Sequence, residues 1–416
     1  MGDCVKFSVR ILIAAALFLA AAVTFVFAFA AYKGKYFFRS EPQLRQTEVN
    51  MEKRALADRH TLTTELCREK LIDDGQKEAY AALKESVFKG ESERMWLDSA
   101  DKDDFQIALN AFSADHPEVF WLDLESGYKF IEYDDNLCVE LLFTDEGDAL
   151  AAKKKELEER VQQAVSSAPD NVSDYEMELY LNDYMTDACA YDIDGEMKHT
   201  AYGALVGGKA VCDGYSHAFQ LLCRRLGIEC TIVEGTSDFN SDADNGHMWN
   251  CILLDGDWYH VDVTWNDSTK AMSRAEHYFY LNLTDAEIAG DHIISGDYDH
   301  RGETGNEFFN IFVPECSSER LNYVKLNFVT VKDPEKDDDI LAALISASRQ
   351  KSSYCAYLVD EDEDFSALTG AVIDKYAAEW IEGSNRYTGS SRRISADSKV
   401  ISYENKRIFA IVLNYE

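Results

Sequence analysis

The stretch of sequence that decides the fold contains three short motifs: VCDGYSHAFQLL (residues 211–222), GHMWN (residues 246–250) and DGDWYHVDVTWND (residues 255–267). They supply a cysteine, a histidine and an aspartate in that chain order: Cys212, His247 and Asp262. A thiol, an imidazole and a carboxylate are the nucleophile, base and orienting group of an acyl-transfer triad. The stretch therefore predicts a catalytic site, provided that local structure brings the three side chains together.

A helix is expected to begin at or just after Cys212. Tyr215, Ala218, Phe219 and Leu222 recur at helical spacing, and small residues precede the cysteine. The N-terminus of a helix carries unpaired backbone N–H groups and the positive end of the macrodipole, which favour a thiolate. The N–H of Cys212 is also placed to stabilise a developing oxyanion.

A hairpin is predicted at Asp255-Gly256, because this dipeptide between two apolar runs is a strong signal for a two-residue turn. Such a turn pairs Leu254 with Asp257. A slip of one residue would move every side chain to the other face of the strands, so the register is a specific prediction.

Counting outward from the turn pairs His247 with Thr264 and Trp249 with Asp262. His247 and Asp262 then become diagonal neighbours on one face, where a carboxylate can orient an imidazole. We expect the Cys212 helix to pack across this face, because the opposite face carries a core-forming apolar stripe: Met248, Ile252, Leu254, Tyr259, Val261 and Val263.

The motifs GKAVCDGYSHAF, GHMWN and WYHVDVTW resemble the core of the transglutaminase-like superfamily, papain-like thiol enzymes that include transglutaminases, peptide N-glycanases and bacterial peptidases. The closest likeness is to a bacterial extracytoplasmic branch, from which Ser216-His217, Met248 and Asn266 are minor departures. The likeness covers roughly residues 171–300, judged by motif. It implies an α+β fold in which a Cys helix packs on an antiparallel sheet, a peptide or protein substrate, and no cofactor or metal.

Charge and hydropathy bear on partners and location. Lys+Arg number 41 against 76 Asp+Glu, a net charge of −35, which argues against nucleic acid as a partner. Residues 11–32 are uncharged and nearly all apolar, long enough to span a bilayer. We favour an uncleaved membrane anchor with the rest of the chain outside the cytoplasm; a cleaved signal peptide, giving a secreted protein, stays open.

Four parts are expected along the chain: the signal anchor or signal peptide with its flanks (1–40), an N-terminal α+β domain (41–165), the transglutaminase-like domain (166–304) and a C-terminal α/β domain (305–416). In the second part we expect helices at 64–89, 103–114 and 148–165 and strands at 119–122, 128–133 and 137–143. In the fourth we expect strands at 324–331, 354–359, 400–404 and 407–413 and helices at 340–348 and 368–381. Ser173 with Glu176 forms a capping box that predicts a helix start.

Three aromatic residues are candidates for substrate binding: Tyr202, Trp249 and Trp265. Trp249 and Trp265 are equally suited to core packing. Tyr202 is also a candidate hydroxyl donor to the oxyanion, although core packing is the favoured role for it. The loop SDFNSDADNG (residues 237–246) alternates acidic residues as an EF-hand does, but lacks its glycine and final glutamate, so a polar loop leading to His247 is the default. His277, His292 and His300 lack metal-ligand spacing and are interpreted as structural or exposed. The 10 cysteines permit either disulfides or reduced buried thiols.

Two classes of function follow. The first is an extracytoplasmic thiol enzyme that cleaves or transfers peptide or protein amide bonds, with water or an amine as the open choice of acceptor. The second is a non-catalytic cell-surface binding or assembly module on the same scaffold. A cell-wall-associated substrate is compatible with either class.

Overall fold

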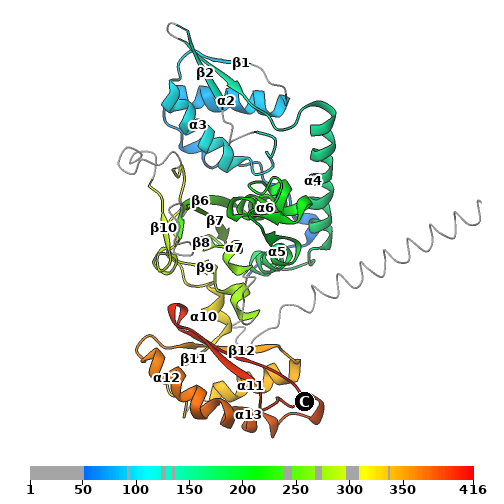
Figure 1. Ribbon diagram of the computed structural model, residues 1–416, viewed down its shortest axis with the longest axis vertical. Coiled ribbons are helices and arrows are strands. Elements are labelled where there is room, and N and C mark those ends of the chain that lie inside the picture. The colour runs from blue at the N-terminus through cyan, green and yellow to red at the C-terminus, as the bar shows by residue number, and fades with distance from the viewer. Residues whose placement is uncertain are drawn as a thin grey trace, which may run out of the picture. The chain divides into compact units, whose positions relative to one another are not determined.

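The computed structural model of the protein describes residues 51–90, 94–122, 128–133, 136–237, 246–267, 274–296, 309–335 and 338–416 (Figure 1). The chain divides into two units, Met1–Glu41 and Pro42–Glu416, and every described residue belongs to the second. The apolar segment at residues 11–32 lies outside the described residues. Within the described ranges, no helix is both long and apolar enough to cross a membrane.

The N-terminal part combines helices with an antiparallel sheet of order β1-β3-β2. Its elements are η1 (Leu56–Asp58), η2 (Arg68–Lys70), α2 (Asp74–Lys89), β1 (Arg94–Leu97), α3 (Lys102–Asp115), β2 (Tyr128–Tyr133), β3 (Asn136–Leu141) and α4 (Gly147–Ser167).

Two sequence predictions in this part are wrong. The helix expected from residue 64 begins only at Asp74, because Asp73 caps it by accepting a hydrogen bond from the Gly75 backbone N–H at 2.8 Å. The strand expected at residues 119–122 is reduced to a single bridge between Leu122 and Phe143. Strand β1, which the sequence analysis missed, pairs with β3 instead.

The central part carries a five-stranded sheet of order β10-β6-β7-β8-β9, antiparallel throughout, with α5, α6 and α7 drawn beside it in Figure 1. Its elements are α5 (Asp174–Ala188), β4 (Ala190–Tyr191), η3 (Gly203–Gly207), β5 (Lys209–Ala210), α6 (Cys212–Arg225), β6 (Cys230–Ser237), β7 (Gly246–Leu254), β8 (Asp257–Val261), α7 (Val263–Asn266), η4 (Arg274–Tyr278), β9 (Leu281–Leu283), α8 (Asp285–Ile288) and β10 (His292–Ile294). The predicted α+β class, with a Cys helix beside an antiparallel sheet, is confirmed.

Both helix starts predicted around the site are confirmed. Helix α6 begins at Cys212, and Tyr215, Phe219 and Leu222 are fully buried against the core. Helix α5 begins after Ser173, whose hydroxyl accepts from the Glu176 N–H while the Glu176 carboxylate accepts from the Ser173 N–H at 2.8 Å. A capping box specifies the start of α5, whereas α6 begins after Val211 without a side-chain cap.

The C-terminal part has a mixed sheet of order β11-β12-β14-β13, in which β11 and β12 are parallel and the other pairs antiparallel. Its elements are α10 (Tyr323–Asn327), β11 (Val329–Val331), α11 (Asp338–Gln350), β12 (Tyr354–Val359), α12 (Phe365–Ala371), η6 (Val372–Tyr376), α13 (Ala377–Asn385), η7 (Ser390–Arg392), β13 (Lys399–Tyr403), η8 (Glu404–Lys406) and β14 (Ile408–Val412). Leu344, Trp380, Tyr357 and Phe409 belong to one core that joins its helices to the sheet.

The strand predicted at residues 324–331 is only partly present. Residues 323–327 are helical, because the Asn322 side chain caps them by accepting from the Lys325 N–H at 3.1 Å. Residues 309–322, which the prediction placed in the C-terminal domain, contact the central sheet. Asn310 donates to the Glu234 carbonyl at 2.9 Å, and Ser318 hydrogen-bonds Tyr259. The predicted domain boundaries stay predictions.

Candidate active site

The hairpin that carries the histidine has the predicted register. Leu254 pairs with Asp257, and the pairing continues to Asn250 with Val261. Asp255 (φ 49°) and Gly256 (φ 90°) both adopt the left-handed conformation that a tight two-residue turn of this kind demands. The Asp-Gly dipeptide therefore determined which side chains of β7 and β8 share a face.

Beyond Val261 the predicted pairing stops. Asp262 caps helix α7 by accepting a hydrogen bond from the Trp265 N–H at 3.0 Å, which turns the chain away from β7. The pairing of His247 with Thr264 is therefore wrong, and His247 pairs with Gly235 on β6 instead. The functional contact is nevertheless present, since His247 Nε2 lies 2.7 Å from Asp262 Oδ2.

The first turn of α6 brings the cysteine to the same place. The Ser216 hydroxyl contacts two carbonyl oxygens at 2.9 Å, those of Cys212 and Met248, so the start of the helix lies beside the start of β7. The thiol of Cys212 lies near enough to the imidazole of His247 to help raise its pKa. Cys212 is partly exposed, and as the first helical residue it has a backbone N–H without an intrahelical acceptor.

The helix does not pack on the predicted face of the sheet. The Asn250 side chain, which points away from the His247 face, donates to the Ser216 carbonyl at 3.1 Å. Cys230, on the same face as Asn250, contacts Cys223 of the helix. Helix α6 thus covers the face with the apolar stripe, and the prediction that it crosses the His247 face is wrong. Only its N-terminus reaches His247, at the end of the sheet.

Electrostatics favour a charged His–Asp pair. Asp262 is fully buried, which alone would raise its pKa, but the charge of His247 and hydrogen bonds from two histidines hold that pKa well below its usual range. Burial alone would lower the pKa of His247; Asp262 and the Cys212 thiol more than reverse this and raise it to about 9. At neutral pH the pair is therefore an imidazolium beside a carboxylate.

The second histidine on Asp262 is His292, which the sequence analysis interpreted as structural or exposed. Its Nε2 lies 3.0 Å from Asp262 Oδ2 and its Nδ1 lies 2.7 Å from Asp291 Oδ1. Ionised carboxylates only accept hydrogen bonds, so His292 donates from both nitrogens as an imidazolium. Although burial opposes it, these two carboxylates raise the pKa of His292.

Two further side chains hold the Asp291 carboxylate in place. Its Oδ2 accepts from the Tyr280 hydroxyl at 2.6 Å and pairs with Lys406 Nζ at 2.9 Å. Lys406 belongs to the hairpin connection between β13 and β14, and its ammonium lies 3.9 Å from the centre of the Tyr280 ring. The C-terminal sheet is thereby linked through charged contacts to the carboxylate that orients His247. No spacing rule in the sequence points to this link.

Of the three predicted substrate-binding residues, only Trp265 borders the triad with part of its surface exposed. Its ring centre lies 5.9 Å from that of His247 and 4.5 Å from that of His292. Trp249 is fully buried and stacks beneath His247 at 5.9 Å, so it has no surface for a substrate. An added Cβ on Gly235 would lie 2.7 Å from the Trp249 ring, which explains the glycine opposite His247.

Tyr202 lies against helix α4 rather than against the triad. Its hydroxyl bonds Glu156, its ring packs 4.8 Å from that of Phe120, and Lys153 lies 5.8 Å from the ring centre. Burial and Glu156 raise its pKa to about 12. These contacts support the packing interpretation over an oxyanion role.

Tyr191 lies near the triad as well, on the short strand that follows helix α5. It pairs with Ala210 through β4 and β5, and 42% of its surface is exposed. Burial of part of the ring and the nearby charges of Cys212, Asp213 and Asp262 raise its pKa. An exposed phenol therefore lies near the thiol. The sequence alone does not predict this position, because it depends on the pairing of two short strands.

Two groups of side chains in the described ranges have ligand atoms close enough to hold a metal ion: His247 with Asp262 and His292, and Cys251 with His260 and Cys316. In the first group the donors already satisfy one another through the Asp262 carboxylate.

The carbonyl of His277 accepts from Asn182. His300 and the acidic loop at residues 238–245 lie outside the described residues.

Comparison with known proteins agrees with this geometry. Residues 159–263 match the model of the transglutaminase-like superfamily. Mouse kyphoscoliosis peptidase is 32% identical over 83 residues, covering 18% of this chain and 12% of that protein, and the human protein is 38% identical over 66 residues, covering 14% and 10%. This part of the chain is therefore similar to the transglutaminase-like superfamily.

The matches span only small parts of both curated relatives. Among solved structures, a TGase aligns over 45% of this chain and 55% of its own at 13% identity and a TM-score of 0.25. A proposed cysteine protease from Cytophaga hutchinsonii aligns over 33% and 61% at 15% identity and a TM-score of 0.22. The bacterial branch suggested by the motifs stays a prediction.

Proposed function

We propose that the protein is a thiol enzyme that cleaves or transfers amide bonds in peptides or proteins. The observation that carries this proposal is the position of His247, whose Nε2 is held by Asp262 at 2.7 Å while the nearby Cys212 thiol helps to raise the pKa of the imidazole. A nucleophile, a base and an orienting group within hydrogen-bond reach are the requirement for covalent acyl transfer.

In the proposed reaction the Cys212 thiolate attacks the substrate carbonyl carbon, and the backbone N–H of Cys212 donates to the resulting oxyanion. His247, protonated through its interaction with Asp262, gives its proton to the leaving amine. This forms a thioester on Cys212 and a neutral imidazole. The imidazole then takes a proton from the acceptor, which attacks the thioester and releases the Cys212 thiolate, so that the starting thiolate and imidazolium are restored.

Water as acceptor gives hydrolysis, and a lysine amine gives a transglutaminase reaction. The relatives of this scaffold are named peptidases, which favours water. The partly exposed Trp265 and Tyr191 flank the triad and are proposed to contact the substrate near the scissile bond. We place this reaction outside the cytoplasm, on the ground that residues 11–32 read as a membrane anchor.

A peptide library tests the proposal. The protein is incubated with the library, with and without a small primary amine, and products are identified by mass. Shortened or deamidated peptides indicate hydrolysis, and amine adducts indicate transfer. Cys212→Ala is the matched control that must abolish either product. A folded wild-type protein that leaves every peptide unchanged would indicate a non-catalytic binding or assembly module.

A further inference from the structure

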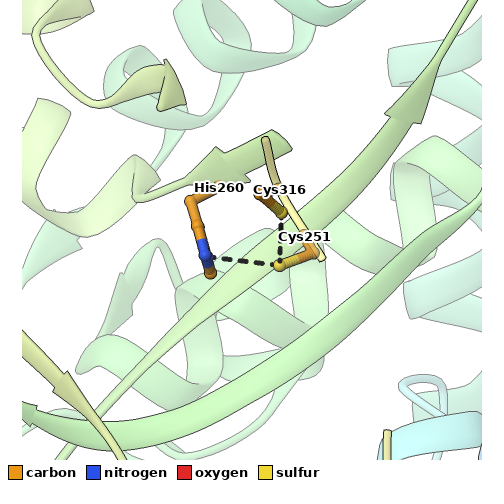
Figure 2. A group of neighbouring side chains, drawn as sticks. All are labelled: Cys251, His260 and Cys316. Atoms are coloured by element: carbon orange, nitrogen blue, oxygen red, sulfur yellow. Dashed lines mark hydrogen bonds between the residues drawn. The ribbon is translucent and has the colours of Figure 1, made fainter. Parts of the chain in front are cut away.

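A second group of reactive side chains lies buried on the sheet, distinct from the triad (Figure 2). Cys251 lies on β7, Cys316 lies in the segment 309–322 that packs on the central sheet, and their sulfur atoms are 3.7 Å apart. The two residues are separated by 65 positions in the chain and are at most 1% exposed. Both are thiols in this structure.

The imidazole beside them has a defined tautomer. The indole N–H of Trp249 donates to His260 Nδ1 at 3.0 Å, and an indole nitrogen can only donate. The proton of His260 is therefore on Nε2, which lies 2.9 Å from Asp285 Oδ1. Figure 2 shows Cys251 between Cys316 and this ring, with its sulfur 3.2 Å from Nδ1.

A metal ion is one possible occupant of this group, since the three ligand atoms lie within 4.8 Å of one another. A carboxylate on the far nitrogen of a histidine is also common around bound metals. However, a metal on His260 Nδ1 would take the lone pair that accepts from Trp249, leaving a buried N–H without a partner. A bond between the two sulfur atoms leaves that hydrogen bond intact.

We propose that Cys251 and Cys316 form a disulfide bond that fastens the segment 309–322 to β7. The electron acceptor is a disulfide, either a small molecule such as oxidised glutathione or an exchange protein. The Cys316 thiolate attacks one acceptor sulfur and expels a thiolate. The Cys251 sulfur then attacks the mixed disulfide, its proton leaves, and a second acceptor thiol is released. Two cysteines are oxidised and one acceptor disulfide is reduced to two thiols.

The two thiols differ in pKa, and such a difference favours thiol–disulfide exchange. A hydrogen bond from Cys251 lowers the pKa of the Cys316 thiol to about 6 against the effect of burial, whereas burial and the neighbouring Cys316 raise that of Cys251. Cys223 and Cys230 form a comparable buried pair, but there burial and the neighbouring thiol both raise the pKa of Cys223. That pair is a matched internal control that stays reduced.

Cys251 lies on the same face of β7 as His247 and Trp249. Trp249 joins the two sites, because its ring stacks on His247 while its N–H donates to His260. A bond between Cys316 and Cys251 of β7 holds the segment 309–322 in place next to His260. The disulfide therefore stabilises the strand that presents His247, and it does so whether or not the triad proves catalytic.

The test uses the full-length chain equilibrated in glutathione buffers, then denatured, alkylated and digested with trypsin and Asp-N, which separates Cys230 from Cys251. We expect a linked peptide pair containing Cys251 and Cys316, lighter by two hydrogen atoms than the reduced peptides, and a higher Tm for the oxidised protein. Cys316→Ser abolishes the pair and leaves Cys251 alkylated. Cys230→Ser preserves it.

Three results would overturn the proposal. In the first, Cys251 and Cys316 are both alkylated after full oxidation. In the second, either cysteine is linked to a different partner. In the third, one zinc ion per chain protects both thiols and is lost in Cys251→Ser, which establishes the metal site instead. Turnover is not part of the readout, so the outcome is independent of the proposed acyl-transfer activity.

Discussion

Replacing Asp262 by Asn removes the charge that holds His247 in its protonated form. The pKa of His247 is about 9 against 6.5 for an ordinary histidine, a difference of 9 − 6.5 = 2.5 units. At about 1.4 kcal/mol per unit this is roughly 3.5 kcal/mol. Both side chains are almost fully buried, so solvent screens little of it. In the variant, only the Cys212 thiol still opposes the effect of burial, so the pKa of His247 falls.

The substitution also disturbs hydrogen bonding. Asp262 accepts from three donors, His247 Nε2, His292 Nε2 and the Trp265 N–H, whereas an asparagine can accept only through its single oxygen. At least one donor then faces the amide NH₂. We expect turnover to fall by a factor on the order of 10²–10³, which corresponds to the 2.5 units, with an additional loss of stability of about 1–3 kcal/mol.

The assay follows the His247 ring by NMR across pH, together with turnover on a peptide from the library. We expect wild-type His247 to titrate near 9 and the variant to titrate at a lower pH. Because the folded pKa exceeds the unfolded one, the wild type loses stability as pH rises from about 6.5 to 9, and the variant lacks this loss. Asp267→Asn, which keeps an acceptor for Tyr215, is the control. A variant that titrates and turns over as the wild type does would refute the reasoning.

Three further outcomes are expected. His292→Gln keeps a donor for Asp262 but removes a cation beside His247, so the alkaline limb of the rate profile moves to higher pH. Turnover falls about tenfold, which corresponds to the loss of one charged hydrogen bond. An unchanged pH profile would show that His292 has only a structural role. Ser173→Ala lowers the free energy of unfolding by about 1 kcal/mol in urea, whereas Ser173→Thr does not. Protease treatment of intact cells degrades residues 41–416 if residues 11–32 anchor the protein outside the cytoplasm, and a protected cytoplasmic chain would exclude that location.

Local chemistry made much of the site predictable. The start of α6 at Cys212, the capping box at Ser173 and the Asp255-Gly256 turn each depend on residues a few positions apart. The contact between His247 and Asp262 was predicted from this turn, although the strand pairing predicted beyond Val261 was wrong. Asp262 leaves the strand to cap α7, and short polar side chains compete with strand pairing in this way.

Contacts between distant segments were not predictable. His292 reaches Asp262 because β10 pairs with β6, far from it in the sequence, and Lys406 reaches Asp291 from another sheet. The packing of α6 on the Asn250 face depends on how both faces of the sheet are covered, which alternation in one hairpin cannot specify. The sequence does not distinguish the roles of Trp249 and Trp265. The fold shows that Trp249 is buried beneath His247 and that Trp265 is partly exposed.

The most direct test of the triad is the reactivity of Cys212 toward iodoacetamide, mapped by peptide mass at pH 6 and pH 9. The other described cysteines are buried, so labelling of the folded protein reports mainly on Cys212. We predict rapid labelling of Cys212 already at pH 6, because this thiol begins a helix beside a protonated His247, and loss of this labelling in His247→Ala. Labelling of Cys212 only above about pH 8, as for an ordinary thiol, or equal labelling in His247→Ala, would contradict the triad.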